Sequence, residues 1–209
     1  IQGKEVLISF DKDKYEVAEV QVLSPSVNSE IEKVKVRIEE GKLIGNGEVL
    51  FTGYYAGDVF RDFNNADQER LKNSFKRRLS KGSNKFIVEN IEFKKVNDSK
   101  DSLNVTYDFE IGNYIKNIGD AMYIDLNLSK QIKDLKVDEK HNTPLVLEYK
   151  WQLDKEFELD IPEGYKVDFL PQKKQGKNDM MSYEVLYSLE GNKIKYRLFY
   201  QLNTILVEV

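Results

Sequence analysis

Residues 142–171 read NTPLVLEYKWQLDKEFELDIPEGYKVDFLP, and apolar and polar side chains alternate through much of this stretch. Alternation with a period of two is typical of a β-strand that has one buried face and one wet face. Pro162 suits the first corner of a tight turn, and Gly164 suits its last position. The stretch therefore predicts antiparallel β-structure, and it carries no pattern of catalytic residues.

The composition of the chain excludes several classes of function. Its 209 residues suffice for one large or two small domains. The 32 basic and 36 acidic residues are well mixed, and the net charge of −4 gives no field that would attract nucleic acid. Because there is no cysteine, a disulfide framework, a thiolate metal site and a cysteine nucleophile are excluded. No apolar run approaches the roughly 20 residues that span a bilayer, so no transmembrane segment is expected.

Other alternating segments predict further strands. We expect them over residues 33–39, 43–52, 85–94, 103–111, 121–128, 181–189 and 192–209. Gly45 and Gly47 fall inside one of these segments, and they predict a bulge or a close approach of another group to the backbone there. The last segment reaches the end of the chain without a polar tail, from which we expect the chain to be a fragment of a larger protein.

One helix is expected over about residues 66–80. Asn65 is a good N-cap residue, and Leu71, Phe75 and Leu79 then recur every four positions, which places them on one apolar stripe. Acidic residues precede this stripe and basic residues follow it, as the helix dipole favours.

We therefore expect a mainly β fold, α+β overall, in two consecutive domains. Residues 1–130 should form an antiparallel sheet or barrel with the one prominent helix lying across it. Residues 131–209 should form a small β-sandwich, with an immunoglobulin-like arrangement as one candidate. The positions predicted to be buried are Val34, Val36, Leu71, Phe75, Leu79, Phe86, Val105, Tyr107, Leu159, Ile161, Val167 and Leu198.

The residues that usually carry catalysis form no convincing site. The single histidine, His141, has nothing like a nucleophile elbow around it, so we expect a structural or solvated role. No metal site and no cofactor are predicted, because the acidic clusters lack the spacing of a calcium loop. The 36 acidic residues single out no carboxylate pair of the kind that glycosidases use. No catalytic residue is therefore assigned.

Two groups of side chains have a binding interpretation and a plainer one. Residues 76–78 are Lys-Arg-Arg and suit phosphate, but the helix dipole already explains them. Tyr54, Tyr55 and Trp151 are the candidate ligand-binding aromatics, because aromatic rings stack on sugars in carbohydrate-binding modules. Packing within a sheet is the competing interpretation for these rings.

Two blocks of sequence resemble a known family. Residues 43–61, LIGNGEVLFTGYYAGDVFR, resemble the region after the catalytic core in bacterial transglutaminase-like proteins that begin with DUF3857 and end, in some members, with DUF3858. The matching positions of the first block are Gly45, Gly47, Gly53, Ala56 and Arg61. The second block, residues 159–171, LDIPEGYKVDFLP, is similar to a pattern in the same proteins in which Leu-Pro, any residue and Gly-Tyr are followed by a valine and a second Leu-Pro, after a strand that begins with Pro-Leu. The order and the separation of the two blocks agree as well, so the resemblance covers most of residues 30–209, although the relatives often carry arginine where this chain has Lys140-His141.

The resemblance implies a role beside an active site. Proteins of this family are common in Bacteroidetes, and their papain-like core uses a Cys-His-Asp triad, which this chain cannot supply. The resemblance implies a non-catalytic C-terminal region of a periplasmic, secreted or cell-envelope protein. Its expected partner is the catalytic domain of the same polypeptide.

Three functional hypotheses follow. The first is an accessory module of a transglutaminase-like protein, which packs on the catalytic core or binds a protein or glycan partner; an exposed apolar surface would favour it. The second is a carbohydrate-binding β module that uses exposed aromatics. The third is an enzyme with a carboxylate pair, which would need two facing acids of raised pKa in an open cleft.

Overall fold

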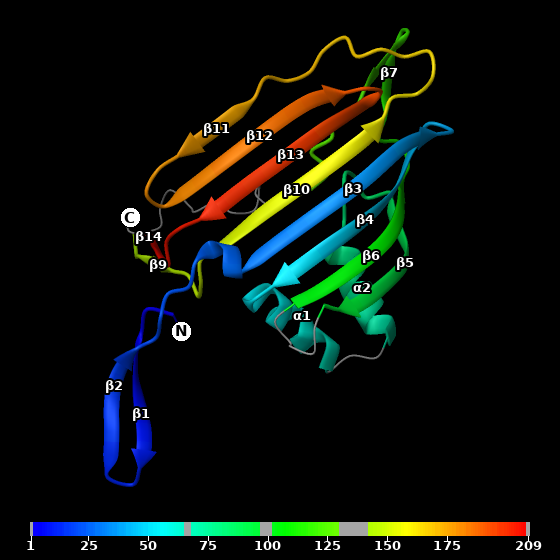
Figure 1. The fold of residues 1–209 in the computed structure, drawn as a ribbon. Coiled ribbons are helices and arrows are strands. Elements are labelled where there is room, and N and C mark those ends of the chain that lie inside the picture. The colour runs from blue at the N-terminus through cyan, green and yellow to red at the C-terminus, as the bar shows by residue number, and fades with distance from the viewer. Residues whose placement is uncertain (1, 65–67, 97–101, 130–141, 208–209) are drawn as a thin grey trace.

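The computed structural model describes residues 2–64, 68–96, 102–129 and 142–207, and one large sheet dominates them (Figure 1). The sheet has eight strands in the order β11-β12-β13-β10-β3-β4-β6-β5, and only the pair β10–β3 is parallel. The strands are β3 (Ser29–Glu39), β4 (Lys42–Thr52), β5 (Phe86–Lys95), β6 (Ser102–Ile111), β10 (Trp151–Asp160), β11 (Lys174–Lys177), β12 (Met181–Glu190) and β13 (Lys193–Leu202). The mainly β class is confirmed, in the form of an open sheet and not a closed barrel.

Smaller strand pairs lie outside the large sheet. They are β1 (Glu5–Asp11) with β2 (Lys14–Glu19), β7 (Lys116–Ile118) with β8 (Ala121–Tyr123), and β9 (Leu145–Val146) with β14 (Leu206–Val207). A short 3-10 helix, η1 (Pro25–Val27), leads into β3. The β1–β2 hairpin, which we call the arm, extends away from the rest of the molecule (Figure 1).

Two helices are found where the sequence predicts one. They are α1 (Tyr54–Asn64) and α2 (Gln68–Arg78), and the predicted helix corresponds to α2. The N-cap predicted at Asn65 lies outside the described residues. The start of α1 is stabilised by Asn28, whose Oδ1 accepts a hydrogen bond from the Tyr54 N–H at 3.0 Å. Because this cap comes from a residue far away in sequence, the local pattern gives no sign of it.

The large sheet is continuous across the predicted boundary near residue 130. Strand β10 pairs antiparallel with β13 and parallel with β3, so it joins strands from both halves of the chain. Strands β10 to β13, which the sequence assigns to a separate sandwich, instead extend the sheet that β3 begins. Most of the predicted boundary segment, residues 129–143, lies outside the described residues.

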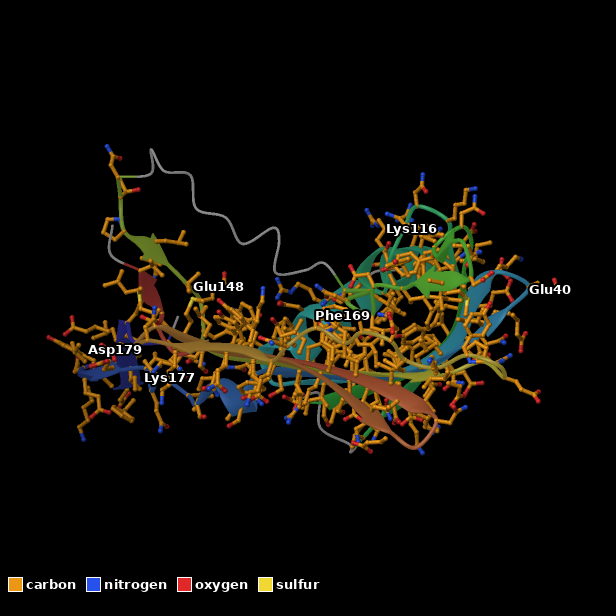
Figure 2. All side chains as sticks on the ribbon, turned by 90° about the horizontal axis from the view of Figure 1, so that it is seen from above. Glu40, Lys116, Glu148, Phe169, Lys177 and Asp179 are labelled. Atoms are coloured by element: carbon orange, nitrogen blue, oxygen red, sulfur yellow. The ribbon has the colours of Figure 1, made fainter. Side chains whose placement is uncertain are left out.

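The sheet has a buried inner face and a charged outer face. The helices lie against the inner face, and side chains crowd between them and the Glu40 end of the molecule (Figure 2). The predicted core positions that are buried are Val34, Val36, Phe75, Leu79, Val105, Tyr107, Leu159 and Leu198. Phe86, Ile161 and Val167 are only partly buried, because they lie on an edge strand or at and beyond the end of β10. The side chain of Leu71 lies outside the described residues.

The glycines of β4 make room for two aromatic rings. A Cβ atom added at Gly45 would lie 2.7 Å from Cζ of Phe109, and one added at Gly47 would lie 2.3 Å from Cζ of Tyr107. The register of β4 against both neighbours is regular, so there is no bulge. Of the two predicted explanations, the close approach is therefore confirmed. It lets the Tyr107 side chain on β6 reach across β4 towards β3.

The turns follow the sequence, but several strands are shorter than the alternation predicts. The strand expected over residues 121–128 ends at Tyr123, and the strand expected over residues 192–209 is interrupted after Leu202. Glu40 and Gly41, which join β3 to β4, both have positive φ, as a two-residue hairpin turn requires. The Tyr165 N–H donates to the Pro162 carbonyl at 3.1 Å, which confirms the turn after β10. Residues 165–173 form no strand, although their alternation suggests one. No helix among the described residues is long and apolar enough to cross a membrane.

Candidate functional site

The three candidate aromatics meet in one cluster. Tyr54 and Tyr55 begin α1, Trp151 begins β10, and Tyr149 lies between them. The rings of Tyr54 and Tyr149 are stacked, with centroids 4.7 Å apart and planes 10° apart. Tyr55 meets Tyr149 and Trp151 edge to face, with centroid distances of 6.1 and 6.3 Å. These contacts join α1 to the start of β10.

Polar groups at the rim of this aromatic cluster are already paired. The Tyr149 hydroxyl donates to Oδ2 of Asp58 at 3.2 Å, and Asp58 also forms an ion pair with Arg61. Burial and the neighbouring Asp58 raise the pKa of Tyr149, and burial raises the pKa of Tyr55, so both hydroxyls stay protonated. Tyr54 is 40% exposed, while Tyr55 and Trp151 are partly buried. Only Tyr54 therefore offers substantial ring surface to a ligand.

Asn28 ties three segments together beneath the aromatic cluster. Its Oδ1 accepts from the Tyr54 N–H at 3.0 Å, and its Nδ2 donates to the Lys150 carbonyl at 2.8 Å. Its own carbonyl accepts from the Gln152 N–H at 3.1 Å. Gly53 has a φ of +57°, and a Cβ atom there would lie 2.3 Å from Oδ1 of Asn28, so the segment before α1 fits closely around this side chain.

A second cluster consists of charged side chains buried in the core. Lys81, which follows α2, donates from Nζ to Oε1 of Glu32 on β3 at 2.7 Å. Lys155 on β10 donates to Oε1 of Glu30 at 2.6 Å and lies 3.3 Å from Oε2 of Glu32. The Tyr107 hydroxyl donates to Oε1 of Glu32 at 2.6 Å. We call these five residues the ionic cluster; all of them are buried.

The ionic cluster joins the two halves of the chain. Lys155 lies directly opposite Glu32 in the parallel pair β10–β3, and it also donates to Oγ of Ser129 at 3.1 Å. Glu32 and Lys155 therefore face each other across the parallel strand pair that joins residues after 142 to those before 130. A buried ion pair costs desolvation energy, but removing one of its partners costs more, because the other charge is left unpaired.

The charges in the cluster hold one another ionised. Burial would raise the pKa of Glu32, but Lys81 and Lys155 outweigh burial and lower this pKa from 4.5 to about 2. Burial lowers the pKa of Lys81, which contacts a single carboxylate. Burial acts in the same direction on Lys155, but the two carboxylates of Glu30 and Glu32 prevail and raise its pKa. Burial and Glu32 raise the pKa of Tyr107 well above its ordinary value, so its hydroxyl remains a donor.

The shifted pKa of Glu32 predicts a loss of stability in acid. A carboxyl whose pKa is lower in the folded state stabilises the fold above its unfolded pKa, here 4.5, and this stabilisation disappears as the pH falls towards about 2. At about 1.4 kcal/mol per pKa unit, the cluster loses about 3 kcal/mol over this window. Urea unfolding at about pH 6 and about pH 3 should show about 2 kcal/mol of this loss, because Glu32 is still largely ionised in the folded state at pH 3. The variant Glu32→Gln should lack this part of the pH dependence; an unchanged dependence in that variant would contradict the assignment.

Neither cluster resembles a catalytic centre. Among the described residues, no group of three or more potential ligands can hold a metal ion. Glu30 and Glu32 lie beside lysines in the core and not in an open cleft, and the pKa of Glu32 is lowered, whereas the carboxylate-pair hypothesis needs a raised one. His141 lies outside the described residues. A shallow groove of about 530 Å³ on the outer face of the sheet has a rim of lysines, acids and amides, among them Lys33, Asn90 and Glu156.

The arm presents apolar side chains to solvent. Leu7, Tyr15 and Val17 are 66%, 71% and 64% exposed, and Ile8 and Phe10 are exposed as well. An isolated two-stranded hairpin is at best marginally stable in water, so an arm with this composition is suited to contact with another surface. By contrast, the large sheet ends in short β11, whose two lysines protect its edge from pairing with another strand.

Sequence reasoning found three of the aromatics and missed the residues that organise both clusters. Asn28, Tyr149, Glu30, Glu32, Lys81 and Lys155 were not singled out. For Glu32 and Lys155 a signal exists, because each occupies an apolar position in the alternation of its strand, two residues from Val34 and from Phe157 respectively. For Asn28 there is no local signal, because its partners are distant in sequence.

Comparison with known proteins gives a match to a family model. The family model described as a domain of unknown function with solved structure, DUF3858, matches residues 120–208. This region contains Ser129, Tyr149, Trp151 and Lys155, and therefore one side of both clusters. No curated protein and no solved structure matches the chain.

Proposed function

We propose that this chain is a non-catalytic accessory module of a secreted or periplasmic transglutaminase-like protein, and that it packs on the papain-like core of the same polypeptide. The DUF3858 match over residues 120–208 supports the second block of the resemblance, since that block, residues 159–171, lies inside it. The absence of cysteine means that any triad of this family must lie outside the chain.

The observation that carries the proposal is the exposed apolar arm. A module that works by packing against another domain needs an exposed apolar surface that becomes buried on contact. The arm provides such a surface in Leu7, Tyr15 and Val17. The ionic cluster and the Asn28 contacts support the same view, because they stiffen the body from which the arm extends. Their ion pairs and hydrogen bonds hold the two halves of the chain together.

The full reading frame and a binding experiment test the proposal. We expect a signal peptide and a Cys-His-Asp core upstream of residue 1. The core and this chain, produced as separate polypeptides, should bind each other with a Kd of about 1 μM or tighter in calorimetry. A start codon immediately before Ile1, or a core that does not bind the chain, would refute the proposal.

A carbohydrate-binding module is the second candidate. It is favoured by one observation, the gathering of Tyr54, Tyr55 and Trp151 around Tyr149. Against it, the Tyr54 ring already stacks on Tyr149. Affinity electrophoresis in polysaccharide gels distinguishes the two candidates: retention that Tyr54→Ala abolishes, and that Tyr123→Ala on β8 leaves intact, would support sugar binding. If no polysaccharide slows the migration of the wild-type chain, the carbohydrate-binding hypothesis is wrong.

A further inference from the structure

One face of the arm combines apolar and acidic side chains. In the antiparallel register of β1 and β2, Leu7 lies opposite Val17, and Glu5 lies opposite Glu19. Tyr15 is two positions from Val17 and therefore points to the same side of the hairpin. We call these five residues the arm face. Its three apolar side chains are each more than 60% exposed.

The arm face is unfavourable in water for two separate reasons. Its apolar side chains pack against no other element in the described residues. Glu5 and Glu19 are a like-charged pair placed directly opposite each other, an arrangement that destabilises an antiparallel pair. Neither carboxylate has an ion-pair partner among the residues that the structure describes. A partner with a cation at this position would relieve the repulsion and cover the apolar side chains together.

The two strands of the arm remain paired down to its root. The Gly3 N–H donates to the Val20 carbonyl at 2.8 Å, and the Val20 N–H donates to the Lys4 carbonyl at 2.9 Å. The buried Gln2 accepts from the Leu23 N–H at 3.0 Å through Oε1. These bonds continue the hairpin ladder down to the body. The two strands that carry the arm face are thus held in register before binding, which lowers the entropic cost of binding.

We infer that the arm face docks on an apolar strip of a folded protein domain, and that an arginine or lysine of that domain lies between Glu5 and Glu19. The inference rests on the proposed function in identifying the domain as the catalytic core of the same polypeptide. The charge of the arm face argues against a second copy of this chain, since an interface of two identical arm faces would contain four carboxylates and no cation to pair with them.

Charge reversal on the two faces of the arm tests the inference. The core, produced separately, is titrated with this chain in a calorimeter at physiological ionic strength. The variant Glu5→Lys with Glu19→Lys should weaken binding at least about 10-fold, because like charges would meet across the interface. The matched control is Glu16→Lys, which changes the same kind of residue on the opposite face of β2 and should change the Kd less than about 2-fold. Val17→Asp should weaken binding at least as much as the double variant.

The outcomes separate the inference from the proposed function. If the core binds the wild-type chain and the Glu5→Lys, Glu19→Lys variant equally well, the inference is wrong and the proposed function stands. If the core does not bind the wild-type chain, the proposed function fails, and the inference with it. If light scattering shows a dimer that Val17→Asp dissociates, the occupant is a second copy, and the inference is overturned. Unchanged circular dichroism and thermal unfolding of each variant confirm that only the interface was altered.

Discussion

Replacing Glu32 with glutamine should lower the free energy of unfolding by about 3–5 kcal/mol, the range found when one partner of a buried ion pair is removed. The substitution preserves the size of the side chain and removes its charge. Lys81 then loses the carboxylate that accepts its hydrogen bond, and the ionic cluster is left with two ammonium groups and one carboxylate. Urea unfolding at neutral pH, followed by circular dichroism, gives the free energies.

The matched control is Glu39→Gln on the same strand. Glu39 pairs with Arg37 on the exposed face of β3, where solvent screens the interaction, so the loss of stability should be much smaller than for Glu32→Gln. Equal losses for the two variants would contradict the stabilising role assigned to Glu32. A further variant combines Glu32→Gln with Lys81→Met, which restores the balance of charge in the core. This double variant should be less destabilised than the sum of its two single variants.

Replacing Asn28 with alanine should cost about 4 kcal/mol. The Tyr54 N–H and the Lys150 carbonyl both lose their hydrogen-bond partner, at a position where Asn28 itself is fully buried. Each backbone group left unpaired in a buried site costs about 1–3 kcal/mol. Because one contact caps α1 and the other holds the start of β10, the loss should also disturb the aromatic cluster. The fluorescence of Trp151, the only tryptophan, should change in the folded variant.

Asn192→Ala is the control for this substitution. Asn192 also donates from Nδ2 to a backbone carbonyl, that of Ile161 at 2.9 Å, but it does so in an exposed turn. Water replaces the lost bond there, so the cost should stay below about 1.5 kcal/mol. A loss for Asn28→Ala no larger than that of the control would show that Asn28 is not the joint between α1 and β10.

Local patterns in the sequence predicted most of the strands, because alternation records which side of a strand is buried. The strand at residues 151–160 follows this rule, whereas the turns at Glu40-Gly41 and Pro162 follow the backbone preferences of glycine and proline. Residues 165–173 alternate too, yet they find no neighbouring strand to pair with. Alternation therefore predicts an extended segment and does not by itself predict a hydrogen-bonded partner.

The order of the strands was beyond local reasoning. The pairing of β10 with β3 joins the two halves of the chain, and the local sequence pattern of neither strand predicts which strand will pair with it. The clue lay in two charges placed where apolar residues were expected, Glu32 and Lys155. Buried charges are rarely left unpaired, so opposite charges in the apolar phase of two strands are a reason to test whether those strands are adjacent. The three candidate aromatics were found because their ring chemistry is visible in the sequence, while Tyr149 was seen only once the fold brought it to them.

The parallel contact between β3 and β10 also governs when the protein becomes complete during synthesis. The Lys155 and Glu30 side chains that meet there are 125 positions apart, so β3, β4, β6 and β5 leave the ribosome long before β10 exists. Until then β3 has an open edge, and Glu30 and Glu32 lack the lysine that joins them. Contacts of such long range slow folding, since a large loop must close before they form. A nascent chain that has not yet reached residue 151 would therefore have only half of the large sheet. Its unpaired strand edge and exposed apolar surface would be accessible to chaperones and proteases at this stage.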